Sequence, residues 1–327
     1  MNSSIKTIGV FTSGGDAPGM NAAIRAVVRT AKYCDKEVKG IYRGYEGMID
    51  GEFIALENHS VSNIIQRGGT FIKTARSERF QTPEGRKLAY ENLKRENIDA
   101  LVAIGGDGTF RGALAFMEEY PIPILGVPGT IDNDLFGTDF TIGYDTAINT
   151  VVEAVDKIRD TAGSHDMLFF IEVMGRDAGF IALRSGIAVG AEDILVPESV
   201  STIEELVNKL SFDRRNNKTS GIIIVSEGEE LGGAYKVAEL VKERYQGFQT
   251  RVTVLGHIQR GGNPSCMDRV LASTLGYEAV IGLLHGKKGA MVGQINNQIV
   301  FIPFEKATKH HPEMNKQMME MARILSL

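Results

Sequence analysis

Short, unbroken runs of apolar residues alternate with helical stretches along most of the chain, and this alternation constrains the fold most strongly. Strands that are hydrophobic throughout are typical of a parallel sheet buried on both faces. The alternation therefore predicts an α/β fold with right-handed crossovers, and 327 residues suit two lobes better than one core. Strands are expected at 5–12, 36–42, 123–127, 167–175, 193–197, 221–228 and 252–256, a strand running into a turn at 99–108, and helices at 17–33, 83–96 and 145–160.

Several predicted strands are followed by a short segment that combines glycine with an acidic or basic residue. In open α/β sheets, ligands bind at the carboxyl ends of the strands. The concentration of such segments at strand ends therefore predicts one shared site. The six segments are SGGDAPGMN (13–21), IGGDGT (104–109), PGTIDND (128–134), VMGRDAG (173–179), VSEGEE (225–230) and GHIQRGG (256–262).

Two of these segments are glycine turns suited to phosphate. Gly14 and Gly15 let backbone N–H groups approach an anion at a helix N-terminus, although a plain tight turn fits equally well. The GGDGT turn repeats the design, and two such turns at adjacent strand ends favour phosphate binding. Asp107 would repel a phosphate unless a cation intervened, which points to Mg²⁺ held by one carboxylate and substrate oxygens. Alternatively, Asp107 caps the helix that follows.

Asp132 and Asp134 stand two residues apart directly after an apolar run. If the backbone is extended there, both side chains face the same way. One carboxylate could then accept a proton from an attacking hydroxyl while the other orients it or holds a metal. Taken alone, the stretch is better explained as an Asx turn that closes the loop.

Basic residues gather at the same strand ends. Arg76, Arg176, Arg251 and Arg260 together indicate a sugar-phosphate pocket, since the guanidinium group matches phosphate geometry. Any one of them could instead form a surface salt bridge. Glu227 could accept hydrogen bonds from sugar hydroxyls or could be a solvated turn residue.

Composition excludes several classes of function. The net charge of −5 offers no basic field for nucleic acid. The two cysteines form no disulfide framework, which favours a reducing, cytoplasmic location. The N-terminal apolar run is too short for a signal core, and no run of about 18 apolar residues predicts a membrane span.

The motifs together resemble the bacterial-type ATP-dependent 6-phosphofructokinase family over essentially the whole chain. The resemblance rests, in order, on GVFTSGGDAPGMNAAIR, RGGTFIKTAR, IGGDGT, PGTIDNDLFGTDFTIGYDTA, EVMGRDAG and TVLGHIQRGGNPS. It implies two Rossmann-like lobes with mostly parallel sheets and an active site in the cleft at the strand C-terminal ends. The ATP-binding lobe would comprise 1–142 plus 258–306, and the sugar-phosphate-binding lobe 143–257 plus 307–327.

By this resemblance the chain is a glycolytic kinase, a phosphotransferase that moves a phosphoryl group from Mg·ATP to the 1-hydroxyl of fructose 6-phosphate. Asp132 would be the base, supported by Asp134, and Arg251 would reach a neighbouring subunit of a homotetramer. Thr130 and Arg176 would share in catalysis. ATP contacts are implied for Gly15, Arg76, Ser77, Gly106, Asp107, Gly108 and Thr109, with Asp107 at the Mg²⁺. Sugar-phosphate contacts are implied for Thr130, Ile131, Asp132, Met174, Gly175, Arg176, Glu227, Arg251, His257 and Arg260.

Two glycines indicate which phosphoryl donor the chain uses. Diphosphate-using relatives typically carry Asp where this chain has Gly108 and Lys where it has Gly129. A carboxylate at 108 would repel the α-phosphate of ATP, and a lysine at 129 would supply charge to a bare diphosphate. Glycine at both positions therefore favours ATP.

The chain departs from the family pattern at two places. Met167 stands where an arginine commonly reaches the neighbour's sugar phosphate, and losing that bond costs roughly 1.5–3 kcal/mol. Asn58 and Asn216 replace basic residues of the effector site, so control by ADP or phosphoenolpyruvate stays open. The family's effector site is otherwise matched by Arg25, Arg29, Arg159, Gly190, Glu192 and Lys218. Two alternatives also remain: a kinase acting on another ketose phosphate, and a non-catalytic sugar-phosphate-binding regulatory subunit.

Overall fold

The structure is a computed structural model that describes residues 5–199, 202–216, 218–307 and 314–326. The chain divides into two compact units, and each contains separate stretches of the sequence. The first comprises Met1–Ile131, Leu135–Thr146 and Arg260–His310, and the second Asp132–Asp134, Ala147–Gln259 and His311–Leu327. The C-terminal return of the sugar-phosphate lobe, expected to begin at 307, includes 308–313, which lie outside the described residues.

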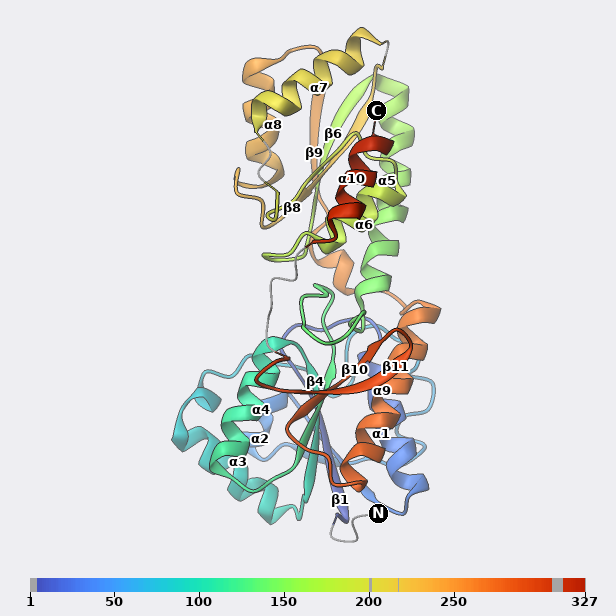
Figure 1. Ribbon diagram of the computed structural model, residues 1–327. Helices are drawn as coiled ribbons and strands as arrows, with labels where there is room; N and C mark the ends of the chain where they lie inside the picture. The colour runs from blue at the N-terminus through green and yellow to red at the C-terminus, as the bar shows by residue number, and fades with distance from the viewer. Residues whose placement is uncertain (1–4, 200–201, 217, 308–313, 327) are drawn as a thin grey trace. The chain divides into compact units, whose positions relative to one another are not determined.

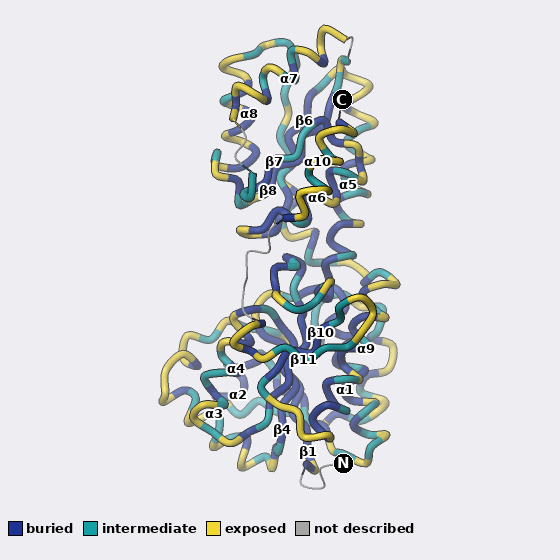
Figure 2. The backbone as a smooth tube through the Cα atoms, viewed as in Figure 1, coloured by how far each residue is buried: buried dark blue, intermediate teal, exposed yellow. Residues whose placement is uncertain are grey.

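The first unit is built on a seven-stranded sheet with the strand order β11-β10-β5-β4-β1-β2-β3. The five strands from β10 to β2 run parallel, and β3 and β11 pair antiparallel with β2 and β10 at the two edges. Every residue of the central strands β1, β4 and β5 is buried, which Figure 2 shows as dark blue tube. The strands are β1 (Thr7–Ser13), β2 (Glu37–Ile41), β3 (Phe53–Ala55), β4 (Ala100–Gly105), β5 (Ile124–Pro128), β10 (Ala290–Ile295) and β11 (Gln298–Pro303).

Helices flank this sheet, with α1 and α9 to one side and α2, α3 and α4 to the other (Figure 1). The helix α3 starts where sequence rules place a start: Thr82 accepts a hydrogen bond from the Gly85 amide, and Pro83 is the first helical residue. Aromatic rings fill much of the core under α4, where Phe110 stacks on Phe304 with ring centres 5.4 Å apart. The helices are α1 (Met20–Tyr33), α2 (Gly44–Asp50), η1 (Arg79–Gln81), α3 (Pro83–Arg95), α4 (Asp107–Glu119) and α9 (Cys266–Leu284).

The second unit has a four-stranded, fully parallel sheet with the order β7-β8-β6-β9. Its core contains Leu168, Phe170, Ile223 and Val225 from the strands, packed against apolar residues of α7 and α8. The strands are β6 (Met167–Val173), β7 (Asp193–Leu195), β8 (Gly221–Ser226) and β9 (Gln249–Val254). The helices are α5 (Tyr144–His165), whose first three residues belong to the first unit, α6 (Phe180–Ala188), α7 (Ile203–Arg215), α8 (Gly233–Arg244), η2 (Gly256–Arg260) and α10 (Lys316–Leu325).

The C-terminal helix α10 differs from the others, because none of its residues is buried. Its apolar side chains Met321, Ile324 and Leu325 are 40%, 56% and 65% exposed. One hydrogen bond, from Lys209 Nζ to Ser326 Oγ at 2.7 Å, ties the end of this helix to α7.

The predicted α/β class with mostly parallel sheets is confirmed. The strand expected within 99–108 is β4, which ends at Gly105, and the turn expected after it is short because Asp107 already begins α4. The segment after β5 is not extended, because Asn133 lies in the left-handed region at φ +54°.

Candidate active site

Two glycine turns lie next to each other in the first unit, because β1 and β4 are paired up to Ser13 and Gly105. Gly14 lies at φ +86°, which only glycine adopts without strain. A Cβ placed on Gly105 would lie 2.5 Å from the Ser13 carbonyl oxygen, so the approach of the two strand ends requires glycine. Two turns that allow close backbone approach therefore lie side by side at one edge of the sheet, where phosphate was expected.

Asp107 is the first residue of α4, and its nearly buried carboxylate contacts the guanidinium of Arg111 one turn later. The cap position belongs to Gly106, so the alternative that Asp107 caps this helix is wrong. Beside it, Gly108 has open space, since a Cβ there would meet no atom within 4 Å. Thr109 donates its hydroxyl to the Ser13 carbonyl at 3.2 Å and so joins the two turns.

Arg260 belongs to the first unit and packs against Gly15. A Cβ on Gly15 would lie 2.0 Å from Arg260 Nη1 and 3.0 Å from its Cζ. A side chain at position 15 would therefore push the guanidinium of Arg260 out of this place. The structure thus brings together Gly15 and Arg260, which the resemblance assigns to different substrates.

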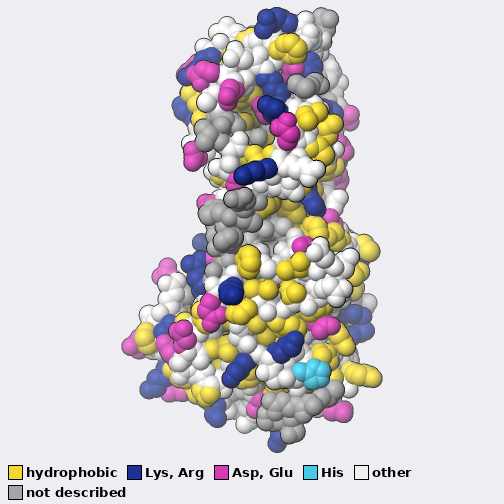
Figure 3. All heavy atoms as spheres, in the orientation of Figure 1, with side chains coloured by type: hydrophobic (Ala, Val, Ile, Leu, Met, Phe, Trp, Pro, Cys, Tyr) yellow, Lys and Arg dark blue, Asp and Glu magenta, His cyan; other side chains and the backbone are white. Residues whose placement is uncertain are grey.

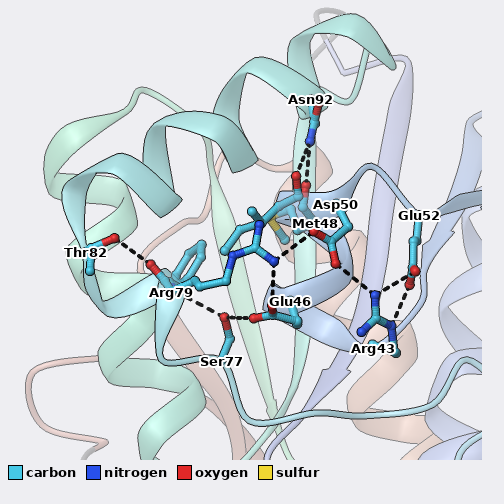
Figure 4. Close-up of polar contacts among 11 residues, drawn as sticks. Arg43, Glu46, Met48, Asp50, Glu52, Ser77, Arg79, Thr82 and Asn92 are labelled. Atoms are coloured by element: carbon cyan, nitrogen blue, oxygen red, sulfur yellow. Dashed lines mark hydrogen bonds and ion pairs between the residues drawn. The ribbon is translucent and has the colours of Figure 1, made fainter.

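A network of ion pairs and hydrogen bonds includes Ser77, the residue after Arg76 (Figure 4). Arg43 donates to Asp50 at 2.9 Å, and Arg79 donates to Asp50 at 2.8 Å and to Glu46 at 2.6 Å. The Ser77 hydroxyl donates to the other oxygen of Glu46 and accepts the Phe80 amide at 3.1 Å. Arg79, followed by Arg43, lowers the pKa of Asp50. Ser77 is therefore held by protein groups, whereas Arg76 is exposed.

The stretch from Pro128 to Asp134 leaves the sheet after β5. Gly129 is bridged to Ile142, and the Thr130 carbonyl accepts the Thr141 hydroxyl at 2.6 Å. Asp132 and Asp134 are 5% and 4% exposed. Because Asn133 between them is left-handed, the expectation of two carboxylates on one side of an extended backbone is wrong. Asn tolerates this conformation better than most residues do, which explains the D-N-D order.

In the second unit, Arg176 contacts Asp132. The distance from Arg176 Nε to Asp132 Oδ2 is 3.8 Å, and Arg176 is another non-glycine residue with positive φ, +54°. Glu227, which follows β8, accepts the amides of Gly175 at 3.3 Å and Arg176 at 2.7 Å. Glu227 is thus more than a solvated turn residue, because its carboxylate holds the strained turn that presents Arg176.

Of the other expected sugar-phosphate residues of this unit, Met174 and His257 follow β6 and β9, whereas Arg251 lies within β9. The Met174 amide donates to Gln259 Oε1 at 3.2 Å, and Gln259 is fully buried. His257 is exposed on η2. Arg251 is exposed on β9, an edge strand, in register with Phe169 and two residues beyond the pair Met167–Gln249. Because side chains alternate along strands, positions 167 and 251 share one face of the sheet.

The six expected effector residues divide between the units. Arg25 and Arg29 lie one turn apart on α1, where burial and then Arg29 lower the pKa of Arg25. In the second unit, Arg159 donates to the carbonyls of Val189 and Gly190. Lys218 lies 3.8 Å from Glu192, whose pKa is raised by burial.

Several residues that contribute to these surroundings were not predicted from the sequence. Gln259 lies inside the segment GHIQRGG, but nothing in that segment separates it from its neighbours. Arg111 and Glu46 lie at helical positions beside expected residues, and only tertiary packing reveals their contacts. Among the residues that the structure describes, no group of three or more His, Cys, Asp or Glu side chains could hold a metal ion.

Charges of both signs are interspersed over the face of the molecule that Figure 3 shows. In the part of the chain that the structure describes, no helix is both long and apolar enough to cross a bilayer.

Comparison with known proteins gives one consistent result. The family model described as phosphofructokinase matches residues 7–283. The protein named ATP-dependent 6-phosphofructokinase 2 from Bacteroides thetaiotaomicron is 54% identical over 323 residues, covering 99% of each chain. ATP-dependent 6-phosphofructokinase 1 of Thermus thermophilus is also 54% identical, over 99% of this chain and 100% of its own.

Solved structures agree with the sequence comparison. A phosphofructokinase structure from Saccharomyces cerevisiae has a TM-score of 0.89 and 37% identity, covering 98% of this chain, which spans 48% of the yeast chain. A pyrophosphate-dependent phosphofructokinase from Marinobacter aquaeolei has a TM-score of 0.83 and 26% identity, over 96% of this chain and 86% of that one. The chain belongs to the phosphofructokinase family.

Proposed function

We propose that this chain is an ATP-dependent 6-phosphofructokinase of glycolysis. It transfers the γ-phosphoryl group of ATP to the 1-hydroxyl of fructose 6-phosphate. The bond between the sugar oxygen and the γ-phosphorus forms, the bond from that phosphorus to the β,γ-bridging oxygen breaks, and ADP leaves. Full-length likeness to relatives of that name carries the proposal.

The first unit supplies the nucleotide side of this reaction. Its paired glycine turns offer backbone N–H groups and the N-terminus of α4 to phosphates. Gly15, Arg76, Ser77 and the segment 106–109 are the proposed ATP contacts, with Ser77 acting through its backbone because its hydroxyl is bonded to Glu46.

The Asp107 carboxylate suits a Mg²⁺ ion that binds together with the nucleotide. Mg²⁺ is usually bound through one or two carboxylates plus substrate phosphates, and Asp107 is a nearly buried carboxylate at a helix N-terminus. When bound, the ion would neutralise charge on the transferring phosphoryl group. The ion would replace the contact between the Arg111 guanidinium and the Asp107 carboxylate, so this arginine must move aside.

Asp132 is the proposed base. A phosphoryl acceptor needs a group within hydrogen-bond reach to take the hydroxyl proton. Arg176 Nε lies 3.8 Å from Asp132 Oδ2, so a cationic side chain stands beside this carboxylate. Asp134 and Thr130 complete the proposed catalytic group, and Ile131, Met174, Gly175, Glu227, Arg251, His257 and Arg260 the sugar-phosphate contacts.

The environments of two glycines favour ATP over diphosphate. The open space at Gly108 leaves room for the nucleotide, whereas an aspartate there would place a charge in it. A Cβ on Gly129 would lie 3.0 Å from Met20 and 3.2 Å from Ile104, so a lysine there requires repacking.

Met167 motivates a second candidate, the same chemistry on another ketose phosphate. It shares a sheet face with Arg251 and offers no hydrogen-bond donor. If fructose 6-phosphate is not the preferred acceptor, Met167→Arg should raise its kcat/KM selectively, while the exposed Met321→Arg should leave it unchanged.

Assembly and location belong to the same proposal. Arg251 is exposed on an edge strand and so is available to a neighbouring subunit of a homotetramer. Cys34 and Cys266 are both free thiols, which suits the cytoplasm. Sedimentation equilibrium of the purified protein measures the assembly directly.

The decisive assay supplies pure protein with fructose 6-phosphate, Mg²⁺ and either ATP or diphosphate. The 1,6-bisphosphate is measured by ³¹P NMR. The proposal expects product with ATP only. No turnover at millimolar sugar phosphate would refute it and favour the non-catalytic binding subunit, and turnover with diphosphate alone would refute the donor assignment.

A further inference from the structure

The turn after β1 contains one half of the backbone pattern of an anion-binding nest. Gly14 lies at φ +86°, and Gly15, the next residue, lies outside the left-handed region. A left-handed residue paired with a right-handed neighbour makes successive N–H groups converge on one concavity, and Gly14 supplies the left-handed member of such a pair. Such a concavity binds a phosphate oxygen only if both peptide planes are held in the right orientation.

Two threonine hydroxyls fix those planes. Thr109 Oγ1 donates to the Ser13 carbonyl at 3.2 Å, and Thr74 Oγ1 donates to the Gly14 carbonyl at 2.8 Å. In a trans peptide, the carbonyl of one residue and the N–H of the next point in opposite directions. Holding the Ser13 carbonyl therefore directs the Gly14 N–H, and holding the Gly14 carbonyl directs the Gly15 N–H.

Thr74 is itself held from β1. The buried hydroxyl of Thr12 donates to the Lys73 carbonyl at 2.9 Å and lies 3.0 Å from the Thr70 hydroxyl. Lys73 has φ +57°, a conformation that a non-glycine residue keeps only when its surroundings impose it. The segment before Thr74 is thus fixed to the strand that leads into the nest.

We infer that Thr74 is a positioning residue for phosphate binding, acting through the Gly14 carbonyl to direct the Gly15 N–H toward the donor nucleotide's phosphates. Thr74 need not touch the nucleotide for this role. The inference rests on the proposed function, since it assigns the anion of this nest to a nucleotide phosphate. It adds a residue that the family resemblance did not assign.

The side chain offers a clean test because its shape and its hydroxyl can be separated. Thr74→Val keeps the branched shape and removes the donor, so the Gly14–Gly15 peptide can rotate. Thr74→Ser keeps the donor. Thr202→Val is the matched control, since Thr202 also makes one hydroxyl contact, the cap of α7 in the second unit.

The full-length protein is titrated calorimetrically with the non-hydrolysable nucleotide Mg·AMP-PNP and with AMP, which lacks the β- and γ-phosphates. We expect Thr74→Val to raise the Kd for Mg·AMP-PNP by about tenfold, because a misdirected donor loses most of its hydrogen bond. The Kd for AMP should change by less than about twofold, and Thr74→Ser should restore binding to within about twofold of wild type. Thr202→Val should lower Tm without changing either Kd.

Three results would overturn the inference. Equal Mg·AMP-PNP affinity in wild type and Thr74→Val would do so while leaving the proposed function intact. Parallel loss of AMP and AMP-PNP binding would mean that Thr74 acts on the nucleoside or on folding. If wild type binds no nucleotide, both the inference and the proposed function fail.

Discussion

Replacing Gly15 with alanine tests whether the nucleotide turn also seats an arginine for the sugar phosphate. The added Cβ would lie 2.0 Å from Arg260 Nη1 and 3.0 Å from Cζ. Nonbonded carbon contacts are most favourable at about 3.5–4.0 Å, so the guanidinium must move by roughly 1.5 Å. The atoms that clash are the end of a flexible side chain, so the backbone turn should persist and stability should change little.

The functional cost is larger than the structural one. If Arg260 donates a charge-assisted bond to the sugar phosphate, its displacement forfeits about 1.5–3 kcal/mol. We therefore expect the KM for fructose 6-phosphate to rise about 10- to 100-fold. The KM for ATP should rise much less, because the Gly15 N–H remains.

Steady-state kinetics with each substrate varied in turn measures this split. Gly163→Ala is the matched control, since Gly163 is exposed in α5 and a Cβ there meets no atom within 4 Å. That variant should be as active as wild type and more stable by up to about 1 kcal/mol. In an Arg260→Met background, Gly15→Ala should raise the sugar KM no further, because the displaced group is already gone. A raised ATP KM with an unchanged sugar KM would refute the reasoning.

The other predictions concern charged side chains. Asp132→Asn should lower kcat by about 10²- to 10⁴-fold with little change in nucleotide affinity, and near-normal kcat would contradict the base assignment. Arg79 and Arg43 lower the pKa of Asp50, so wild type should be more stable than the Asp50→Asn variant above about pH 4. This difference in stability should vanish as the pH falls through the lowered pKa. Thermal unfolding across pH measures this difference, and a difference that does not change as the pH is lowered would contradict the prediction. Arg111→Met removes the arginine that contacts the Asp107 carboxylate and should tighten nucleotide-free Mn²⁺ binding by up to about fivefold in paramagnetic resonance titrations. An unchanged affinity would show that Arg111 does not compete with the ion.

The parts of the fold that the sequence predicted are those decided locally. Strands buried on both faces, such as β4 and β5, are apolar throughout, and α3 carries its own start signal in Thr82 and Pro83. The short edge strand β3 and the antiparallel β11 were not predicted. Both contain apolar runs, but β3 has only three residues and neither strand has a buried residue, so pairing with the neighbouring strand decides whether they form.

The candidate site shows the same division. Glycine motifs marked where phosphate could bind, because the residues that allow close backbone approach are visible in the sequence. The arrangement of Asp132 and Asp134 depended on the backbone angle of Asn133, which residue spacing does not reveal. Contacts such as Arg260 on Gly15 join segments far apart in the chain, so no local pattern could predict them.

The helix α10 has a practical consequence for handling the protein. A helix with no buried residue adds little to the core, so it can open at a free energy well below that of global unfolding. Amide protons of α10 should exchange with solvent long before those of β1 or β4. Limited digestion by a carboxypeptidase should likewise shorten the chain through this helix while the two sheets stay intact, and its exposed methionine Met321 should be oxidised ahead of the buried Met48.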